Sequence, residues 1–394
     1  MAGTVIVGGA RTPIGKLSGS LKNFTAMDLG GIAIAAAMAN AGTTGDQVDH
    51  VIMGHVIQAG AGQATARQAA VKGGIPMTVP ALTVNKVCLS GLNAIALADQ
   101  LIGCGEFDVV VAGGMESMTN GPYLLQKARG GYRYGDSEII DATAHDALFC
   151  SFDQRGMGAS TDVYSAAKGI SRAEQDDYAA MSHDRATTAH KNGLFDPEIT
   201  SVPVPQRKAD PLLVTEDEGV RPGTTAESLA TLRPAFGPDG TVTAGNASQL
   251  SDGAAAVVVM SRAMSERLGL SVLAEIGAHG TVAGPDASLL SQPSHAIAAA
   301  LGRQHLSPSD VDLFEINEAF AAVAVQSMRD LGTGPAVVNV NGGAIAMGHP
   351  VGASGARLAL HLALELGRRG GGLGAAALCG GGGQGEALLL RVDA

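Results

Sequence analysis

Two cysteines lie beside glycines at the ends of apolar runs, where a thiol could react with a bound molecule. Cys88 belongs to VNKVCLSG, residues 84–91, and Cys379 belongs to LCGGGGQG, residues 378–385. A cysteine can act as a nucleophile or as a base, and its thiolate is the reactive form. Glycines behind the thiol would leave peptide N–H groups open to a ligand, because no Cβ stands in the way. A lone cysteine is also a common core residue, and this alternative stays open for Cys88.

A histidine and an asparagine could act together with these thiols. His349 lies in a glycine-flanked turn within NVNGGAIAMGHPVGASGAR, residues 339–357, and Asn317 lies in EINEAF, residues 315–320. A core histidine is usually satisfied by a backbone carbonyl, and an asparagine before a helix is often its N-cap. An asparagine at the carboxyl end of a strand can instead hold a catalytic water. Two thiols, an imidazole and an amide suit acyl transfer through a covalent thioester.

Cys88 itself lies where a predicted strand ends and a predicted helix begins. Backbone N–H groups and the helix dipole at such a junction stabilise a thiolate. Both interpretations of Cys88, a reactive thiol and a buried core cysteine, therefore stay open at this point.

A second motif overlaps the glycine run near the C-terminus. Gly380, Gly382 and Gly385 spell GxGxxG, the fingerprint of a dinucleotide site. That site requires a helix directly after the motif and an acidic residue about 20 positions later. Residues 386–392, EALLLRV, predict a strand instead, so we reject a dinucleotide site.

Composition and charge restrict the class of protein. The chain has 394 residues, 46% of them hydrophobic, which is enough for a large core. A net charge of −11 argues against nucleic acid or an anionic membrane as partner. The four cysteines form no CxxC pair, which argues against a zinc site. We see no signal peptide and no membrane span, and we expect a cytoplasmic protein with free thiols.

Apolar runs that resemble buried strands alternate with helical patterns, and this alternation predicts an α/β fold. In the first half, strands are predicted at 4–9, 50–56, 80–88 and 108–114, and helices at 24–42 and 90–103. In the second half, strands are predicted at 273–280, 311–317, 335–343, 374–381 and 386–392, and helices at 318–332 and 354–367.

The two halves also resemble each other, and a different segment separates them. Ser-Gly opens a predicted helix at Ser90 and again at Ser354, and an apolar strand ending in glycines follows each helix. We interpret this as a duplicated βαβ-rich unit, in which the glycine-rich strand ends converge. Residues 120–249 hold all five tyrosines and eight of the 16 prolines, which indicates an insertion. Within it, Ser171 and Glu174 have capping-box spacing for one helix.

Taken together, the motifs resemble the thiolase family, and most closely its biosynthetic-type acetyl-CoA acetyltransferases. The resemblance extends from ARTPIG at 10–15 to LCGGGGQG at 378–385, and NEAFA and NVNGGAIAMGHPVGASG are specific family patterns. It implies duplicated βαβαβαββ halves, a layered α-β-α-β-α core and an inserted loop domain. The implied divisions are an N-terminal half (1–119 with 250–271), an insertion (120–249) and a C-terminal half (272–394).

The resemblance also implies a reaction and the residues that perform it. Two acetyl-CoA would condense reversibly to acetoacetyl-CoA and CoA through an S-acetyl-cysteine, with CoA as substrate and with no metal or other cofactor. Cys88 would be the nucleophile, and Cys379 would be the acid and base. His349 would activate Cys88 and bind the enolate oxygen together with a water held by Asn317. The N–H groups of Cys88 and Gly381 would bind the oxyanion of the tetrahedral intermediate.

The resemblance implies further contacts to CoA and an assembly. The basic pair Arg207 and Lys208 could meet a phosphate or could be a solvated surface pair. A homotetramer built from dimers is implied, with residues 123–145 as candidate contacts. The implied CoA contacts lie near the adenine and ribose or along the pantetheine: Arg221, Ser228, Met157, Ser248 and Phe320.

Two segments depart from the family pattern beside the implied acyl and pantetheine pocket. Gly156 stands where related biosynthetic enzymes often carry a histidine, and DASLLSQP at 286–293 replaces a Met-Gly-x-Gly-Pro segment. Two alternatives therefore stay open, a degradative 3-ketoacyl-CoA thiolase of broader chain length and a non-catalytic acyl-CoA-binding protein.

Overall fold

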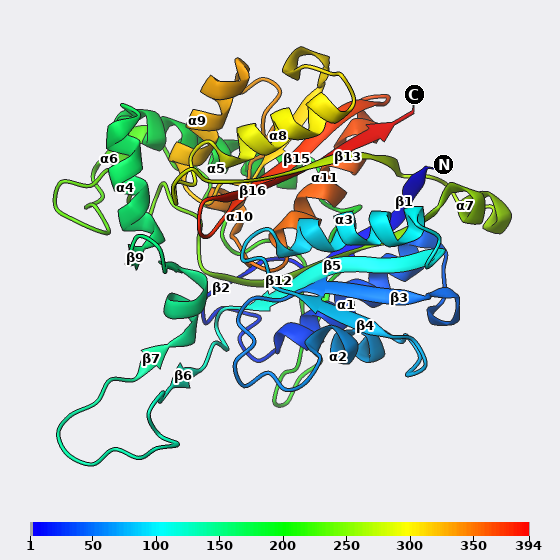
Figure 1. Ribbon diagram of the computed structural model, residues 1–394, viewed down its shortest axis with the longest axis horizontal. Coiled ribbons are helices and arrows are strands. Elements are labelled where there is room, and N and C mark those ends of the chain that lie inside the picture. Colours follow the sequence, from blue (N-terminus) through cyan, green and yellow to red (C-terminus); the bar gives the residue numbers. More distant parts are fainter. Residues whose placement is uncertain (1–2, 394) are drawn as a thin grey trace.

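The computed structural model describes residues 3–393 and shows an α/β protein with two similar halves (Figure 1). The large sheet contains β1 (Thr4–Arg11), β2 (Gly15–Lys16), β3 (His50–Gly54), β4 (Ala81–Val84), β5 (Val109–Ser117), β12 (Ser251–Ser261), β13 (Ala274–Ala283), β14 (Leu313–Ile316), β15 (Gly372–Gly380) and β16 (Gln384–Val392). The helices of the two halves are α1 (Ala26–Ala41), η1 (Gly45–Gln47), α2 (Thr65–Lys72), α3 (Ser90–Gly103), α7 (Arg262–Leu268), α8 (Gln292–Arg303), η3 (Pro308–Asp310), α9 (Ala321–Leu331), α10 (Ala344–Met347) and α11 (Ser354–Arg368).

The strands form one continuous path with a narrow junction between the halves. The order is β14-β15-β16-β13-β1-β12-β5-β3-β4, and β2 pairs with β12 beside this path. Strands β3, β4 and β5 pair in parallel, as do β14 and β15, whereas the other pairs on the path are antiparallel. Among the strands of residues 3–393, the halves pair with each other only where Val5 lies opposite Glu275 and Ile6 lies opposite Ala274. Most of the contact between the halves therefore has to come from helices.

The helices build the layers of the core. Helices α1 and α2 cover one face of the first-half strands, and α8 covers the outer face of β13, β15 and β16. Helices α3 and α11 pack against each other and contact strands of both halves. The order across the molecule is therefore helix, sheet, helix, sheet, helix, and the predicted layered α/β fold is confirmed.

The sequence of β5 shows why this strand is buried on both faces. Side chains alternate along a strand, so Val109 and Val111 face the cluster under α1, whereas Val110 and Ala112 face α3 and α11. All four side chains are fully buried. A continuous apolar run is what such a central strand requires.

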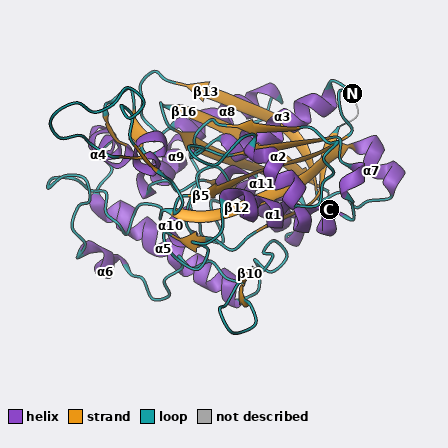
Figure 2. Ribbon diagram, turned by 90° about the horizontal axis from the view of Figure 1, so that it is seen from below, coloured by secondary structure: helices purple, strands orange, loops and turns teal. Residues whose placement is uncertain are grey.

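Residues 120–249 lie outside these layers (Figures 1 and 2). The segment between β6 and β7 forms a long arm in Figure 1, and α5 and α6 lie along one side of the core in Figure 2. The predicted capping box is confirmed, because Ser171 accepts from the N–H of Glu174 at the start of α5. The elements are β6 (Tyr123–Leu124), β7 (Ile140–Asp141), the π-helical turn η2 (Thr143–Ala147), β8 (Phe149–Cys150), β9 (Arg155–Gly156), α4 (Met157–Ala167), α5 (Arg172–Lys191), β10 (Val202–Val204), β11 (Leu212–Val214) and α6 (Ala226–Ala230).

One predicted strand, at 335–343, was wrong. Only Val338 forms an isolated bridge to Phe314. Asn339 replaces further ladder bonds with its side chain, which accepts from the N–H of Ile316 and donates to its carbonyl. The backbone at Asn339 also has a positive φ of 47°, which an extended strand does not allow.

A buried ion cluster ties the insertion to the core. Arg11, at the end of β1, donates from Nε to Glu198 at 2.6 Å and from Nη1 to Asp217 at 2.7 Å. Glu198 also contacts Nδ1 of His361 on α11 at 2.8 Å. Burial alone would raise the pKa of Glu198, but His361 and Arg11 outweigh this effect and lower the pKa to about 2. Both carboxylates are therefore ionised, and they depend on the guanidinium.

Replacing Arg11 by methionine should lower the free energy of unfolding by about 3–5 kcal/mol, because two buried carboxylates lose the guanidinium that they share. Denaturant unfolding followed by circular dichroism measures this loss. Arg262→Met is the matched control, since its ion pair with Glu275 is partly exposed and worth at most about 1 kcal/mol. Equal losses in the two variants would contradict the stabilising role of the cluster.

Candidate active site

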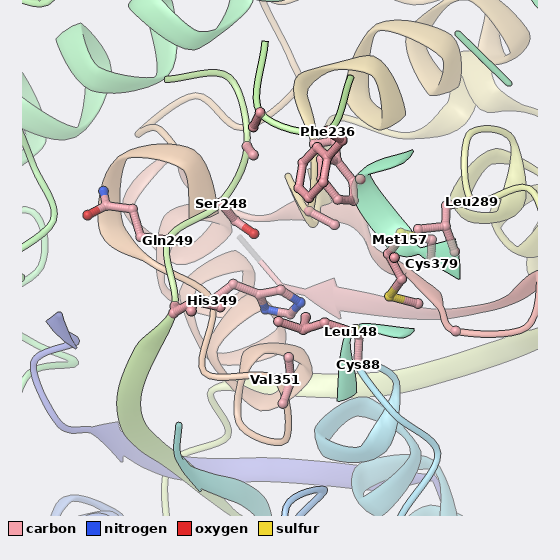
Figure 3. A pocket seen from close by; sticks show the side chains of 18 of the residues that line it. Cys88, Leu148, Met157, Phe236, Ser248, Gln249, Leu289, His349, Val351 and Cys379 are labelled. Atoms are coloured by element: carbon pink, nitrogen blue, oxygen red, sulfur yellow. The ribbon is translucent and has the colours of Figure 1, made fainter. Parts of the chain in front are cut away.

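A cavity of about 370 Å³ lies where β15, the turn before α3 and the insertion meet (Figure 3). Its walls are almost entirely apolar, and three chemically active side chains, from Cys88, His349 and Cys379, reach it from different parts of the chain. The two thiols therefore share one cavity although they are far apart in sequence. The other predicted site residues that line it are Met157, Ser248, Phe320 and Gly381.

A strained turn presents Cys88 to the cavity. Strand β4 ends at Val84, before the predicted end at 88, and α3 begins at Ser90. Val87 has a positive φ of 52°, which is unusual for a β-branched residue. The Ser90 hydroxyl accepts from the N–H of Lys86 at 2.8 Å and donates to the carbonyl of Val87 at 2.6 Å. These bonds hold the turn in the strained conformation that aims Cys88 at the cavity.

The Cys88 thiol is neutral in this environment. Burial raises its pKa to about 12, its own backbone N–H lowers it, and the nearby carboxylate of Glu116 raises it. The prediction that the start of α3 stabilises a thiolate was therefore wrong, because the loss of solvent outweighs the N–H groups. Cys88 needs a base before it can attack a carbonyl.

His349 can supply that base. Its Nδ1 lies 2.6 Å from the Ser354 hydroxyl, which itself donates to the carbonyl of Pro350 at 3.0 Å. Since the hydroxyl proton is used there, we assign the imidazole proton to Nδ1 and a lone pair to Nε2. Burial lowers the pKa of His349 to about 3, and Arg357 lowers it as well, so the ring is neutral. Figure 3 shows this ring projecting into the cavity.

Asn317 lies directly behind His349. Its Nδ2 is 3.3 Å from Nε2 of His349, and its side chain is fully buried at the end of β14. Helix α9 begins only at Ala321, with Phe320 as its N-cap, so the N-cap interpretation of Asn317 was wrong. Among residues 3–393, Oδ1 of Asn317 has no hydrogen-bond partner. A buried amide oxygen left in this way is costly unless a water or a ligand binds it.

Cys379 lies near the end of β15, paired with Gly385 on β16. The space beside the following glycines is small: a Cβ at Gly380 would lie 2.6 Å from the branched part of Leu89, and one at Gly381 would lie 2.9 Å from the terminal methyl of Met157. Burial raises the pKa of Cys379, and Cys88 raises it further when Cys88 is ionised. The two thiols therefore interact electrostatically, and ionisation of one makes ionisation of the other less favourable.

Two predicted CoA contacts lie away from the cavity lining. Arg221 and Ser228 are both exposed. The backbone N–H of Arg221 donates to Nδ1 of His183, and the Ser228 hydroxyl bonds to Thr225 at the start of α6. Their predicted roles at the adenine and ribose stay predictions. The same holds for the exposed pair at 207–208.

The sequence did not reveal most of the apolar wall. Phe236 covers Gly158, where an added Cβ would lie 2.0 Å from the ring, so the glycine is required for this packing. Gly156 also lines the cavity, and a Cβ there would meet no atom within 4 Å among the described residues. Other lining residues that motif spacing could not indicate are Met118, Leu148, Gln249, Leu289, Ala319 and Val351.

Comparisons with known proteins agree with this fold. The family model "Thiolase, N-terminal domain" matches residues 4–263, and "Thiolase, C-terminal domain" matches residues 270–392. The chain therefore belongs to the thiolase family, and it is an acyltransferase.

Its similar relatives include proteins named for one reaction of this family. A probable acetyl-CoA acetyltransferase of Mycolicibacterium smegmatis is 60% identical over 98% of this chain and 100% of its own length. A probable acetyl-CoA acetyltransferase of Mycobacterium tuberculosis is 60% identical over 99% and 100%. The acetyl-CoA acetyltransferase of Cupriavidus necator is 48% identical over 99% and 100%.

Proposed function

We propose that this protein is an acetyl-CoA C-acetyltransferase, which condenses two acetyl-CoA to acetoacetyl-CoA and CoA in a reversible reaction. The names of relatives up to 60% identical over nearly the whole chain support this substrate. The observation that carries the chemistry is that Cys88, Cys379 and His349 share one apolar cavity. A binding protein without catalysis would not need two buried thiols beside an imidazole that accepts a proton.

The first half-reaction forms the S-acetyl intermediate. Nε2 of His349 takes the proton of Cys88, and the thiolate attacks the carbonyl carbon of acetyl-CoA. The N–H groups of Cys88 and Gly381 bind the oxyanion that develops. The C–S bond to CoA then breaks, and the CoA thiolate takes the proton of Cys379 as it leaves. The site now holds acetyl-Cys88, an imidazolium at His349 and a thiolate at Cys379.

The second half-reaction forms the carbon–carbon bond. The Cys379 thiolate removes a proton from the methyl group of a second acetyl-CoA, and the His349 imidazolium and a water on Asn317 stabilise the enolate oxygen. The enolate carbon attacks the acetyl carbon on Cys88, and the C–S bond to Cys88 breaks. Cys88 takes its proton back from His349. Acetoacetyl-CoA leaves, and all three side chains return to their starting protonation states.

The proposed CoA contacts are those that the family resemblance implies. Met157, Ser248 and Phe320 line the cavity, and we assign them to the pantetheine, with Arg221 and Ser228 toward the nucleotide. The proposed reaction uses CoA as substrate and needs no metal or further cofactor.

We also propose a cytoplasmic homotetramer. The arm between β6 and β7 supports this assembly, because it carries the exposed side chains of Leu125, Tyr132, Tyr134 and Ile139. Among residues 3–393, no helix is long and apolar enough to cross a membrane.

Incubation with acetyl-CoA followed by an acid quench tests the proposed function. We expect the peptide that contains Cys88 to gain the mass of one acetyl group, because the covalent intermediate forms before the second substrate binds. Peptide mass spectrometry locates the label. Cys104→Ala is the control, since Cys104 is exposed and lies outside the cavity lining. An unlabelled Cys88, or a label that depends on Cys104, would contradict the proposed mechanism.

A further inference from the structure

The turn that follows His349 inserts into a socket in the other half of the protein. The carbonyl oxygen of Gly352 faces Gly54 at the end of β3, Gly91 at the start of α3 and Gly114 in β5. A Cβ at these positions would lie 2.7, 2.9 and 1.9 Å from that oxygen. Such contacts are too short for any side chain, so all three positions need glycine. We call these three residues the glycine socket.

One buried carboxylate closes this socket. Oε2 of Glu116, on β5, accepts from the N–H of Gly352 at 3.1 Å and from the N–H of Val56 at 3.0 Å. Its Oε1 accepts from the N–H of Ile57 at 3.1 Å and lies 3.3 Å from Nε2 of His55. Glu116 is fully buried. A single side chain therefore bonds to the backbone of both halves, and charged acceptors make the strongest bonds of this kind.

We propose that Glu116 is a positioning residue, which fixes His349 over Cys88 by holding Gly352 in the glycine socket. This inference depends on the proposed function, because it assumes that His349 activates Cys88. His349 and Cys88 belong to different halves. Along the chain, only Pro350 and Val351 separate His349 from Gly352. A shift of about 1 Å in such a pair can cost roughly 100-fold in rate.

The charge of Glu116 makes this role depend on pH. Burial raises the pKa of Glu116 to about 7, the three N–H groups lower it, and Asp252 raises it. His55 also faces the carboxylate, and burial lowers the pKa of His55 to about 4, so that ring is neutral. Above pH 7, Glu116 is ionised and accepts all its bonds. Below pH 7, it gains a proton, and one oxygen becomes a donor that faces N–H groups.

Ionised Glu116 also has a cost, since its charge raises the pKa of Cys88. If this cost dominated, neutralising Glu116 would speed up the formation of acetyl-Cys88. If positioning dominates, as we infer, neutralising it slows that step. The sign of the change therefore separates the two effects.

Glu116→Gln tests the proposal, because it keeps the shape of the side chain but removes the charge and one acceptor. We expect kcat for acetoacetyl-CoA thiolysis to fall about 10–100-fold with KM changed by less than about threefold. We expect the wild-type rate to fall below a pH of about 7 and the variant to lack this acid limb. The rate of Cys88 acetylation, measured in samples quenched at different times, should fall by the same factor as kcat.

Glu365→Gln is the matched control, since Glu365 is also buried but bonds to Asn341 and Arg369 and does not line the cavity. Glu116→Asp keeps the charge, so it should lose rate but retain the acid limb, and it serves if the Gln variant does not fold. Wild-type kcat in Glu116→Gln, an equal loss in Glu365→Gln, or an unchanged acid limb would overturn the proposal. An unlabelled Cys88 in the wild-type enzyme would instead overturn the proposed function.

Discussion

Replacing Cys379 with alanine should lower the rate of acetoacetyl-CoA formation by about 10³–10⁴-fold while acetyl-Cys88 still forms. The variant lacks the base that removes the methyl proton, and general base catalysis contributes roughly this much. The first half-reaction loses only the proton donor to CoA, which the His349 imidazolium can replace. Acetyl-enzyme should therefore accumulate, and intact-protein mass spectrometry after a quench would detect it beside the steady-state assay.

Cys88→Ala is the companion variant that tests this separation of roles. It should lose both the acetyl label and turnover, because no covalent path remains. The double variant should be no slower than Cys88→Ala alone, since residues that act as one unit are not additive. Acetylation that disappears in Cys379→Ala as completely as in Cys88→Ala would show that the two thiols do not have separate tasks.

Replacing His349 with alanine should cost about 10³–10⁴-fold in kcat, because one ring serves both as the base for Cys88 and as the donor to the enolate. The acid limb that we assign to Glu116 should also disappear in this variant, because Glu116 affects the rate through the position of His349. The limb does not come from titration of His349 itself, since burial lowers the pKa of His349 to about 3 and keeps the ring neutral between pH 5 and 7. Steady-state kinetics over pH measure both properties.

Asn317→Ala gives the comparison for His349. It removes the group that would hold the water but leaves the base, so we expect a smaller loss, about 10²–10³-fold. Ser354→Ala should also reduce kcat, because Nδ1 of His349 loses the acceptor that fixes its proton. A loss in Asn317→Ala that exceeds the loss in His349→Ala would contradict the roles assigned here.

The sequence predicted the elements whose signals are local. Helix α3 begins at Ser90 and ends at Gly103, as expected, and α1 and α9 end at Gly42 and Gly332 in the left-handed conformation. Glycine has no Cβ penalty there, which is why it marks helix ends so reliably. The motif residues Cys88, His349 and Cys379 likewise line one cavity.

Features that depend on distant partners were missed or wrong. Strand β12 was not predicted, although it lies between β1 and β5, because the run SDGAAAVVVMS begins with residues of low strand propensity. The pattern at 335–343 resembles a strand, but the side chain of Asn339 takes the place of the ladder. The pKa of Cys88 depends on burial and on Glu116, which neither the turn nor the helix start could indicate.

The division of the two thiols between the halves has a consequence for how the enzyme can be divided. The nucleophile lies in the turn before α3 in one half, and its base and its partner thiol come from the other half, while in the described part of the chain the sheet joins the halves at two residue pairs. Neither repeat carries a working remnant of the reaction by itself. Both halves supply catalytic side chains to one cavity, so a chain cut between the repeats would be inactive until the two fragments associated again.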